Sequence, residues 1–139
     1  MMNSWQHFEH KADIGVRGIG KTRQIAFAQT ALAMTAVISD LKTIEQKEII
    51  RITCAYSDDE TSLVDWLNTL LYEMTIHKML FSRFEIQFKD DLLIADAFGE
   101  TLDSKKHQPV VEVKAATYHC LKVEKNSDNS WLAQCVVDV

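Results

Sequence analysis

FEIQFKDDLLIADAF, residues 84–98, alternates apolar and polar side chains over its first half. The apolar set Phe84, Ile86 and Phe88 falls on one face of an extended chain, and Glu85, Gln87 and Lys89 fall on the other. A period of two is typical of a β-strand with one buried face. The acidic pair Asp90 and Asp91 then offers a turn into the apolar run LLIADAF. The stretch therefore predicts a β-hairpin of two antiparallel strands.

Upstream of this hairpin, two segments show the period of an α-helix. The stronger one carries a broad apolar stripe at positions i, i+3, i+4, i+7, i+8 and i+11, namely Leu63, Trp66, Leu67, Leu70, Leu71 and Met74. The acidic residues 58–60 precede it and suit a helix N-terminus. The weaker segment runs from about Thr22, a suitable N-cap, to about Ser39. Its small alanines indicate close packing against a sheet.

Downstream of the hairpin, the sequence predicts two more strands. Residues 111–123 alternate, with Val111, Val113 and Val123 among the residues of one face. NSDNS, residues 126–130, predicts a turn into a last strand, WLAQCVVD, residues 131–138. With the segments before residue 84, the predicted order is strand, strand, helix, strand, helix and four strands. We expect an α+β fold in which two helices pack on a largely antiparallel, mixed sheet.

Composition indicates one soluble domain spanning residues 1–139. A hydrophobic fraction of 47% with 25% charged residues is ordinary for a globular protein, and no Pro- or Gly-rich linker divides the chain. Three widely spaced cysteines without a CxxC pair favour a reducing cytoplasm, and neither a signal peptide nor a membrane-length apolar run is evident. The net charge of −5 argues against direct nucleic-acid binding, so a role in RNA chemistry would pass through another protein.

Two aspartates are candidate metal ligands. Asp13 lies in HKADIG, residues 10–15, and Asp138 stands near the end of an apolar strand where a buried carboxylate needs a partner. The α-carboxylate of Val139 would add a second anion one residue away. Clustered carboxylate oxygens suit a hard cation such as Ca²⁺ or Mg²⁺. The alternative is that Asp13 caps a turn and Asp138 frays in solvent.

Several other polar residues have two interpretations each. His7 and His10 are three positions apart on a predicted strand, so they should face opposite sides, and a structural or supporting role is favoured over a shared zinc. The basic spot formed by Lys105, Lys106 and His107 is either a solvated loop or a contact with a partner or its nucleotide. His119 is in phase with the valine face and is expected to be a satisfied sheet residue.

The chain resembles the archease family over essentially its whole length. The resemblance rests on HKADIG (10–15), Lys21 and Thr22, GETLDSKKH (99–107), EVKAATYH (112–119), and the segment from Trp131 to the terminal Asp138 and Val139. Two positions depart from the family pattern, because Lys11 stands where many relatives carry threonine and Ile25 where an acidic residue is common. Both departures concern local capping and leave the aspartates in place.

The resemblance implies a function that the residues alone do not. It implies a divalent metal bound by Asp13, Asp138 and Val139, with Ca²⁺ first and Mg²⁺ or Mn²⁺ as alternatives. The supporting role considered for His10 does not come from the resemblance. The resemblance also implies a non-enzymatic partner of an RtcB-type RNA ligase, which uses GTP and Mn²⁺ to join RNA ends in tRNA splicing or RNA repair. The family member would promote guanylylation and turnover of that ligase. Two alternatives remain, a chaperone-like modulator of a tRNA methyltransferase and a metal-dependent hydrolase.

Overall fold

The computed structural model describes residues 3–139 and has an α+β architecture, as predicted. Eight strands, two long helices and two short helical turns follow in the order β1 (Ser4–His10), β2 (Asp13–Gly20), α1 (Arg23–Ile38), η1 (Leu41–Thr43), β3 (Glu48–Ala55), α2 (Asp59–His77), β4 (Met79–Lys89), β5 (Leu92–Thr101), α3 (Ser104–His107), β6 (Ala115–Ala116), β7 (Lys122–Lys125) and β8 (Trp131–Asp138). Within the described chain, no helix is long and apolar enough to cross a membrane.

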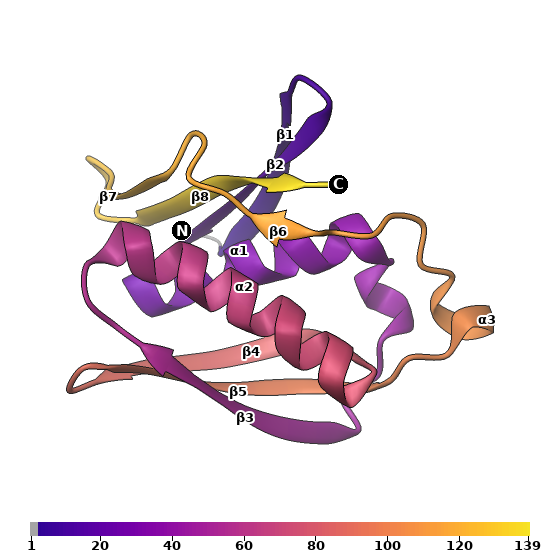
Figure 1. Cartoon of the computed structure of the whole chain (residues 1–139). Coiled ribbons are helices and arrows are strands. Elements are labelled where there is room, and N and C mark those ends of the chain that lie inside the picture. Colours follow the sequence, from indigo (N-terminus) through magenta and orange to yellow (C-terminus); the bar gives the residue numbers. More distant parts are fainter. Residues whose placement is uncertain (1–2) are drawn as a thin grey trace.

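The strands form two sheets, where the sequence suggested one. The first has the order β1-β2-β8-β6, with β7 also pairing with β8, and the second has the order β3-β5-β4. All of these pairs are antiparallel. Figure 1 shows α1 and α2 lying between the two sheets, and both helices contact strands of each sheet. The molecule therefore has three layers, with its core where the helices meet both sheets.

Helix α1 is the most enclosed element. Its N-cap is Thr22, whose hydroxyl oxygen accepts the Ile25 N–H at 3.2 Å, and Ser39 caps its C-terminus, both close to prediction. Because a sheet covers it on each side, most of its residues are buried: Ala26, Phe27, Ala28, Thr30, Ala31, Ala33, Met34, Thr35 and Val37. A helix buried on several sides carries no clear apolar stripe, which explains its weak helical pattern.

Strand β2 approaches α1 so closely that one position must be glycine. A Cβ atom on Gly18 would lie 2.3 Å from the Ala26 carbonyl oxygen and 2.3 Å from the Thr30 nitrogen. The buried Thr30 hydroxyl bridges this contact, donating towards the carbonyls of Ala26 at 2.7 Å and Ala133 at 3.1 Å. Helix α1 is thereby held against both central strands of the first sheet.

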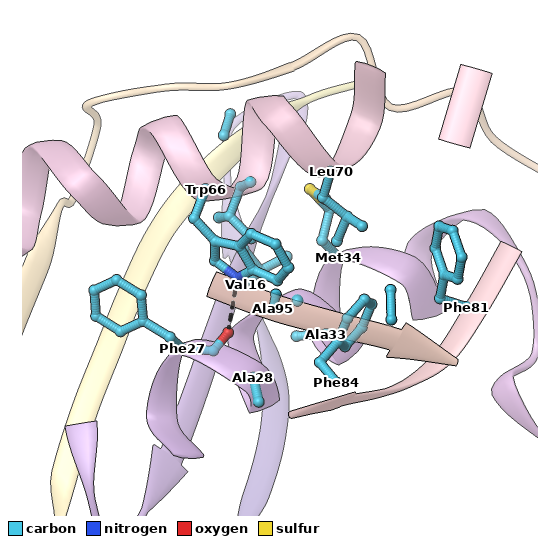
Figure 2. Close-up of a cluster of buried hydrophobic side chains, with 14 of the residues drawn as sticks. Val16, Phe27, Ala28, Ala33, Met34, Trp66, Leu70, Phe81, Phe84 and Ala95 are labelled. Atoms are coloured by element: carbon cyan, nitrogen blue, oxygen red, sulfur yellow. Dashed lines mark hydrogen bonds between the residues drawn. The ribbon is translucent and has the colours of Figure 1, made fainter. Parts of the chain in front are cut away.

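Helix α2 contributes the largest core side chain, Trp66. The Trp66 side chain is fully buried, its indole N–H donates to the Phe27 carbonyl at 3.3 Å, and its ring meets Phe84 edge-on (Figure 2). Asp58 caps the helix by accepting the Thr61 N–H at 2.9 Å. The predicted apolar stripe and acidic start of this helix are confirmed, and Trp66 is a core residue.

The strand predicted over residues 111–123 is wrong in its extent. Only Ala115–Ala116 and Lys122–Lys125 are strand, and both pair with β8. Six positions separate Ala116 from Lys122, but only three separate their partners Val137 and Gln134, so residues 117–121 loop out of the pairing. The loop stays tied to β8 by backbone bonds of Val136 with Thr117 and His119, and the Gln134 side-chain amide donates to the Cys120 carbonyl at 2.9 Å. The alternation thus identified the neighbour of β8 but not this interruption.

We expect the substitution Gly18→Ala to destabilise the fold by about 1–3 kcal/mol, because the added methyl group would meet helix backbone that cannot rotate away. Gly15→Ala is the matched control, since a Cβ there would meet the Phe8 side chain, which can move. Urea unfolding followed by circular dichroism measures both variants. Equal losses of unfolding free energy would contradict the close contact between β2 and α1.

Candidate metal centre

Asp13 opens β2 directly after a tight turn. Lys11 and Ala12 form the two-residue connection between His10 and Asp13, which are paired across β1 and β2. Two-residue hairpin turns favour positive φ, and Lys11 has a φ of 54°. A lysine in this left-handed region costs of order 1 kcal/mol, which the β1–β2 pairing must offset. The turn fixes Asp13 at the first position of a strand.

The sheet register brings Asp13 to Asp138. Strand β2 pairs with β8 from Gly20↔Trp131 to Ile14↔Val137, so Asp13 and Asp138 are the next facing pair of the same register. Residues that face each other across antiparallel strands lie on the same side of the sheet. The Val139 N–H points to the Asp13 carboxylate, with the nitrogen 3.5 Å from Oδ1. In Figure 1 the C-terminus lies beside the β1–β2 hairpin.

The aspartates at this end of the sheet lack ion-pair partners in the described part of the chain. Asp13, Asp138 and Val139 are all half-buried. Among residues 3–139, neither aspartate has a lysine, arginine or histidine within ion-pair distance. Two carboxylates held close together repel each other unless a cation or a proton compensates. This oxygen-only donor set fits a hard divalent cation.

Protein side chains alone would leave such a cation incompletely surrounded. In the part of the chain that the structure describes, no group of three or more His, Cys, Asp and Glu side chains is arranged to hold a metal. Asp13, Asp138 and waters would therefore supply only part of a coordination shell, and the carboxylate at Val139 stays a prediction. Ca²⁺ and Mg²⁺ accept water in their remaining positions.

The two histidines of β1 face opposite sides of the sheet, as predicted. His7 donates from Nε2 to the Ala33 carbonyl of α1 at 2.7 Å. His10 faces Asp13 across the β1–β2 pair, and its ring centroid lies 5.7 Å from that of His119. The His10 Nδ1 atom is buried and has no hydrogen-bond partner among the described residues. His10 is thus a neighbour of Asp13.

His119 does not lie on a strand, contrary to expectation. It is exposed in the 117–121 loop, which places it beside His10. The loop is tied to β8 at this point, since the Val136 N–H donates to the His119 carbonyl at 3.1 Å. Sequence periodicity assigned His119 to a sheet face because the local sequence gives no sign that this segment has three more residues than the part of β8 beside it.

The basic spot at residues 105–107 is built around a buried carboxylate that the sequence did not single out. Glu100 accepts hydrogen bonds from Lys106 Nζ at 3.1 Å, from His107 Nε2 at 2.9 Å and from the Glu45 N–H at 2.8 Å. The His107 Nδ1 atom accepts the Asp103 N–H at 2.9 Å, so the ring is neutral with its proton on Nε2. We call Glu45, Lys47, Glu100, Lys106 and His107 the Glu100 cluster.

Burial changes the prediction for His107. Its side chain has no exposed surface, so it cannot touch a partner directly, and it instead orders the loop after β5. Lys106 is one-third exposed and also binds Glu45, with Nζ 2.6 Å from Oε2. A contact of Lys106 with a partner or its nucleotide stays a prediction.

Relatives place the chain in a family. The model of the archease protein family (MTH1598/TM1083) matches residues 5–139. The chain belongs to the archease family. It is 41% identical to protein archease of Pyrococcus abyssi, over 99% of this chain and all of that one. It is 36% identical to protein archease of Methanosarcina barkeri, over 97% of this chain and 95% of that one.

Solved structures agree with the archease fold. The solution structure of protein 1598 of Methanobacterium thermoautotrophicum matches with a TM-score of 0.84 and 31% identity, over 98% of this chain and 99% of that one. An archease of Thermotoga maritima, described as a possible chaperone, matches with a TM-score of 0.63 and 20% identity, over 96% of each chain. The second likeness concerns the fold alone.

We expect Glu100→Gln to lower the free energy of unfolding at pH 7 by roughly 2 kcal/mol, because charged hydrogen bonds to Lys106 and the Glu45 N–H are weakened. These same bonds lower the pKa of Glu100 from 4.5 to about 2. A lowered folded-state pKa gives stability that is complete above pH 4.5 and is lost as the pH falls towards 2.

The difference between wild type and Glu100→Gln should therefore shrink across that window, which urea titrations at several pH values measure. Glu9→Gln, at an exposed residue of β1 outside the Glu100 cluster, is the control and should change little. A difference between wild type and Glu100→Gln that is independent of pH would contradict the proposed ionised state of Glu100.

Proposed function

We propose that this protein is a metal-binding accessory protein that activates an RtcB-type RNA ligase by promoting its guanylylation and multiple turnover. The observation that carries the proposal is the register that aligns Asp13 with Asp138, where no basic side chain of residues 3–139 forms an ion pair with either aspartate. Membership of the archease family supports an accessory role. The net charge of −5 supports contact with a protein, with RNA reached only through the ligase.

In this proposal Asp13, Asp138 and the α-carboxylate of Val139 hold a divalent cation, with Ca²⁺ as the first candidate and Mg²⁺ or Mn²⁺ as alternatives. Hard cations take oxygen ligands, and Ca²⁺ tolerates the irregular geometry of strand ends better than Mg²⁺ does. The cation would relieve the repulsion between the carboxylates and fix the end of β8 to the start of β2. His10 would support Asp13 from the neighbouring strand.

Asp13→Asn should weaken Ca²⁺ binding by roughly tenfold or more, because a neutral amide replaces a ligating carboxylate. Asp65→Asn is the matched control, since it removes one negative charge from an exposed position of α2. Isothermal titration calorimetry with Ca²⁺, Mg²⁺ and Mn²⁺ compares the three proteins. Equal affinities in wild type and Asp13→Asn would exclude Asp13 as a ligand.

The α-carboxylate of Val139 can be tested separately. Appending three glycines after Val139 moves the carboxylate away while leaving both aspartates in place, so Ca²⁺ affinity should fall. The control carries the same three residues before Met1. If calorimetry gives the same affinity for both proteins, Val139 contributes no ligand.

Ligase activation is measured directly as guanylylation of the cognate ligase at limiting concentration with GTP and Mn²⁺. Wild-type protein should raise both the rate and the number of turnovers, and Asp13→Asn should raise neither, while Asp65→Asn behaves as wild type. Absence of acceleration by the wild-type protein would overturn the proposed function. If the same preparation still binds Ca²⁺, the metal site would be retained and only the ligase would be excluded as the partner.

A chaperone-like role towards a tRNA methyltransferase is a second candidate, favoured by the description of the Thermotoga maritima relative. It predicts co-purification with the methyltransferase and reduced aggregation of that enzyme.

A metal-dependent hydrolase is a third candidate. It predicts turnover of phosphoesters by the purified protein with metal and without the ligase.

A further inference from the structure

A large groove lies beside the C-terminal half of α2, at the edge of the hydrophobic core. Its volume is about 820 Å³, and its walls are the C-terminal half of α2, the start of β4 and the segment 109–114. Apolar side chains dominate these walls, among them Leu71, Met74, Met79 and Val113. At the rim, Tyr72 is 64% exposed and Val110 is 78% exposed. A concave, mostly apolar recess with an exposed rim is the usual form of a binding site.

One wall of the groove offers backbone hydrogen-bonding groups. The segment 109–114, between α3 and β6, lines the groove together with the C-terminal half of α2. The Val110 N–H donates to the Ile38 carbonyl and the Lys114 N–H to the Asp138 carbonyl, which anchors the segment at both ends. Among the described residues, nothing pairs with the N–H and C=O groups of residues 111–113. Unpaired backbone of this kind is a template for an added strand.

The Asn68 side chain already forms strand-like hydrogen bonds with the backbone next to this wall. Its side-chain amide donates to the Ala116 carbonyl at 3.2 Å and its Oδ1 accepts the Ala116 N–H at 2.8 Å. The pair of bonds is the one that a neighbouring strand would make, and Asn68 also lines the groove. Bonds of the same kind are open to a peptide at residues 111–113, whereas the Lys114 N–H is already bonded to the Asp138 carbonyl on the β8 side.

Exposed lysines at the groove favour a ligand that carries negative charge. Lys78 and Lys114 stand at the groove, are exposed, and have no ion-pair partner in the described part of the chain. Glu112 is the single acidic residue of the lining. Two free lysines in a protein of net charge −5 complement an acidic residue of the ligand.

We propose that the groove between α2 and residues 109–114 binds an extended apolar segment of a partner protein that carries an acidic residue. The segment adds as a strand beside residues 111–113, seats alternate apolar side chains against Leu71, Met74 and Met79, and places its carboxylate near Lys114, which adjoins that stretch of backbone. This inference goes beyond the proposed function and needs neither the metal nor the ligase.

The first test is selection from a random twelve-residue peptide display library on immobilised wild-type protein, with Thr75→Trp as the counter-target. Thr75 is exposed and lines the groove, so tryptophan there fills it while the core stays intact. We expect peptides enriched on wild type over Thr75→Trp, with alternating apolar residues and at least one Asp or Glu. Absence of enrichment over the variant would overturn the proposal.

The second test uses one selected peptide, synthesised, with the ¹⁵N-labelled full chain. Its titration should shift the backbone amide signals of residues 111–113. N-methylation of alternate peptide nitrogens should weaken binding by roughly tenfold or more through lost hydrogen bonds. Lys114→Glu should weaken it by roughly two- to fivefold and favour a peptide with lysine in place of the acid, whereas Lys89→Glu, in the β4–β5 hairpin, should not.

Three results would overturn the proposal: amide shifts confined to another surface, insensitivity of binding to N-methylation, or insensitivity to Lys114→Glu. Shifts of residues 111–113 that depend on protein concentration without peptide would instead identify a second copy of this chain as the occupant. Loss of ligase activation with peptide binding intact would concern the proposed function alone.

Discussion

The antiparallel pairing of β2 with β8 is the interaction on which the rest of the molecule depends. It joins residues near the start of the sequence to its last strand, and it fills the centre of the first sheet. Strand β8 is buried on both faces, with Ala133, Cys135 and Val137 on one side and Gln134 and Val136 on the other. A one-residue slip would exchange these two faces, so packing specifies the register strongly.

The same register creates the candidate metal centre. Asp13 meets Asp138 because Ile14 meets Val137, and the core accepts only that alignment. The pairing places two acidic residues at facing positions of neighbouring strands. A ligand that binds only this aligned state would stabilise the fold by mass action. Fold and candidate site therefore depend on the same pair of strands, β2 and β8.

Short sequence patterns correctly predicted the elements that depend on contacts between residues close together in the chain. The helix caps at Thr22 and Asp58 and the β4–β5 hairpin depend on residues a few positions apart, and all three are confirmed. The division into two sheets could not be predicted in this way, because periodicity tells which face is buried but not against which layer. The broken strand at 117–121 depends on bonds to β8, among them the bond from the side-chain amide of Gln134 to the carbonyl of Cys120, fourteen residues earlier.

The candidate sites also differ in how far the sequence alone could identify their residues. The aspartates were identified through a family pattern at the chain ends, and the structure supplies the register that aligns them. The Glu100 cluster was missed because Lys106 and His107 look like surface residues until Glu100, on β5, draws them inward. The spacing of GE and KH in residues 99–107 was the available signal. A short polar loop gives no sign of burial when the partner that buries it lies in a neighbouring strand.

The position of Asp138 is set by neighbours on both sides. Strand β2 lies along one edge of β8, and on the other edge Ala115 faces Asp138 while the Lys114 N–H donates to its carbonyl at 2.9 Å. A carboxylate carried by a strand paired on both edges is held more precisely than one on a loop. The segment that secures Asp138 is also the wall of the groove beside α2. One stretch of chain thus holds the backbone of Asp138 in place and lines the groove beside α2, so the candidate metal centre and the groove share a structural support.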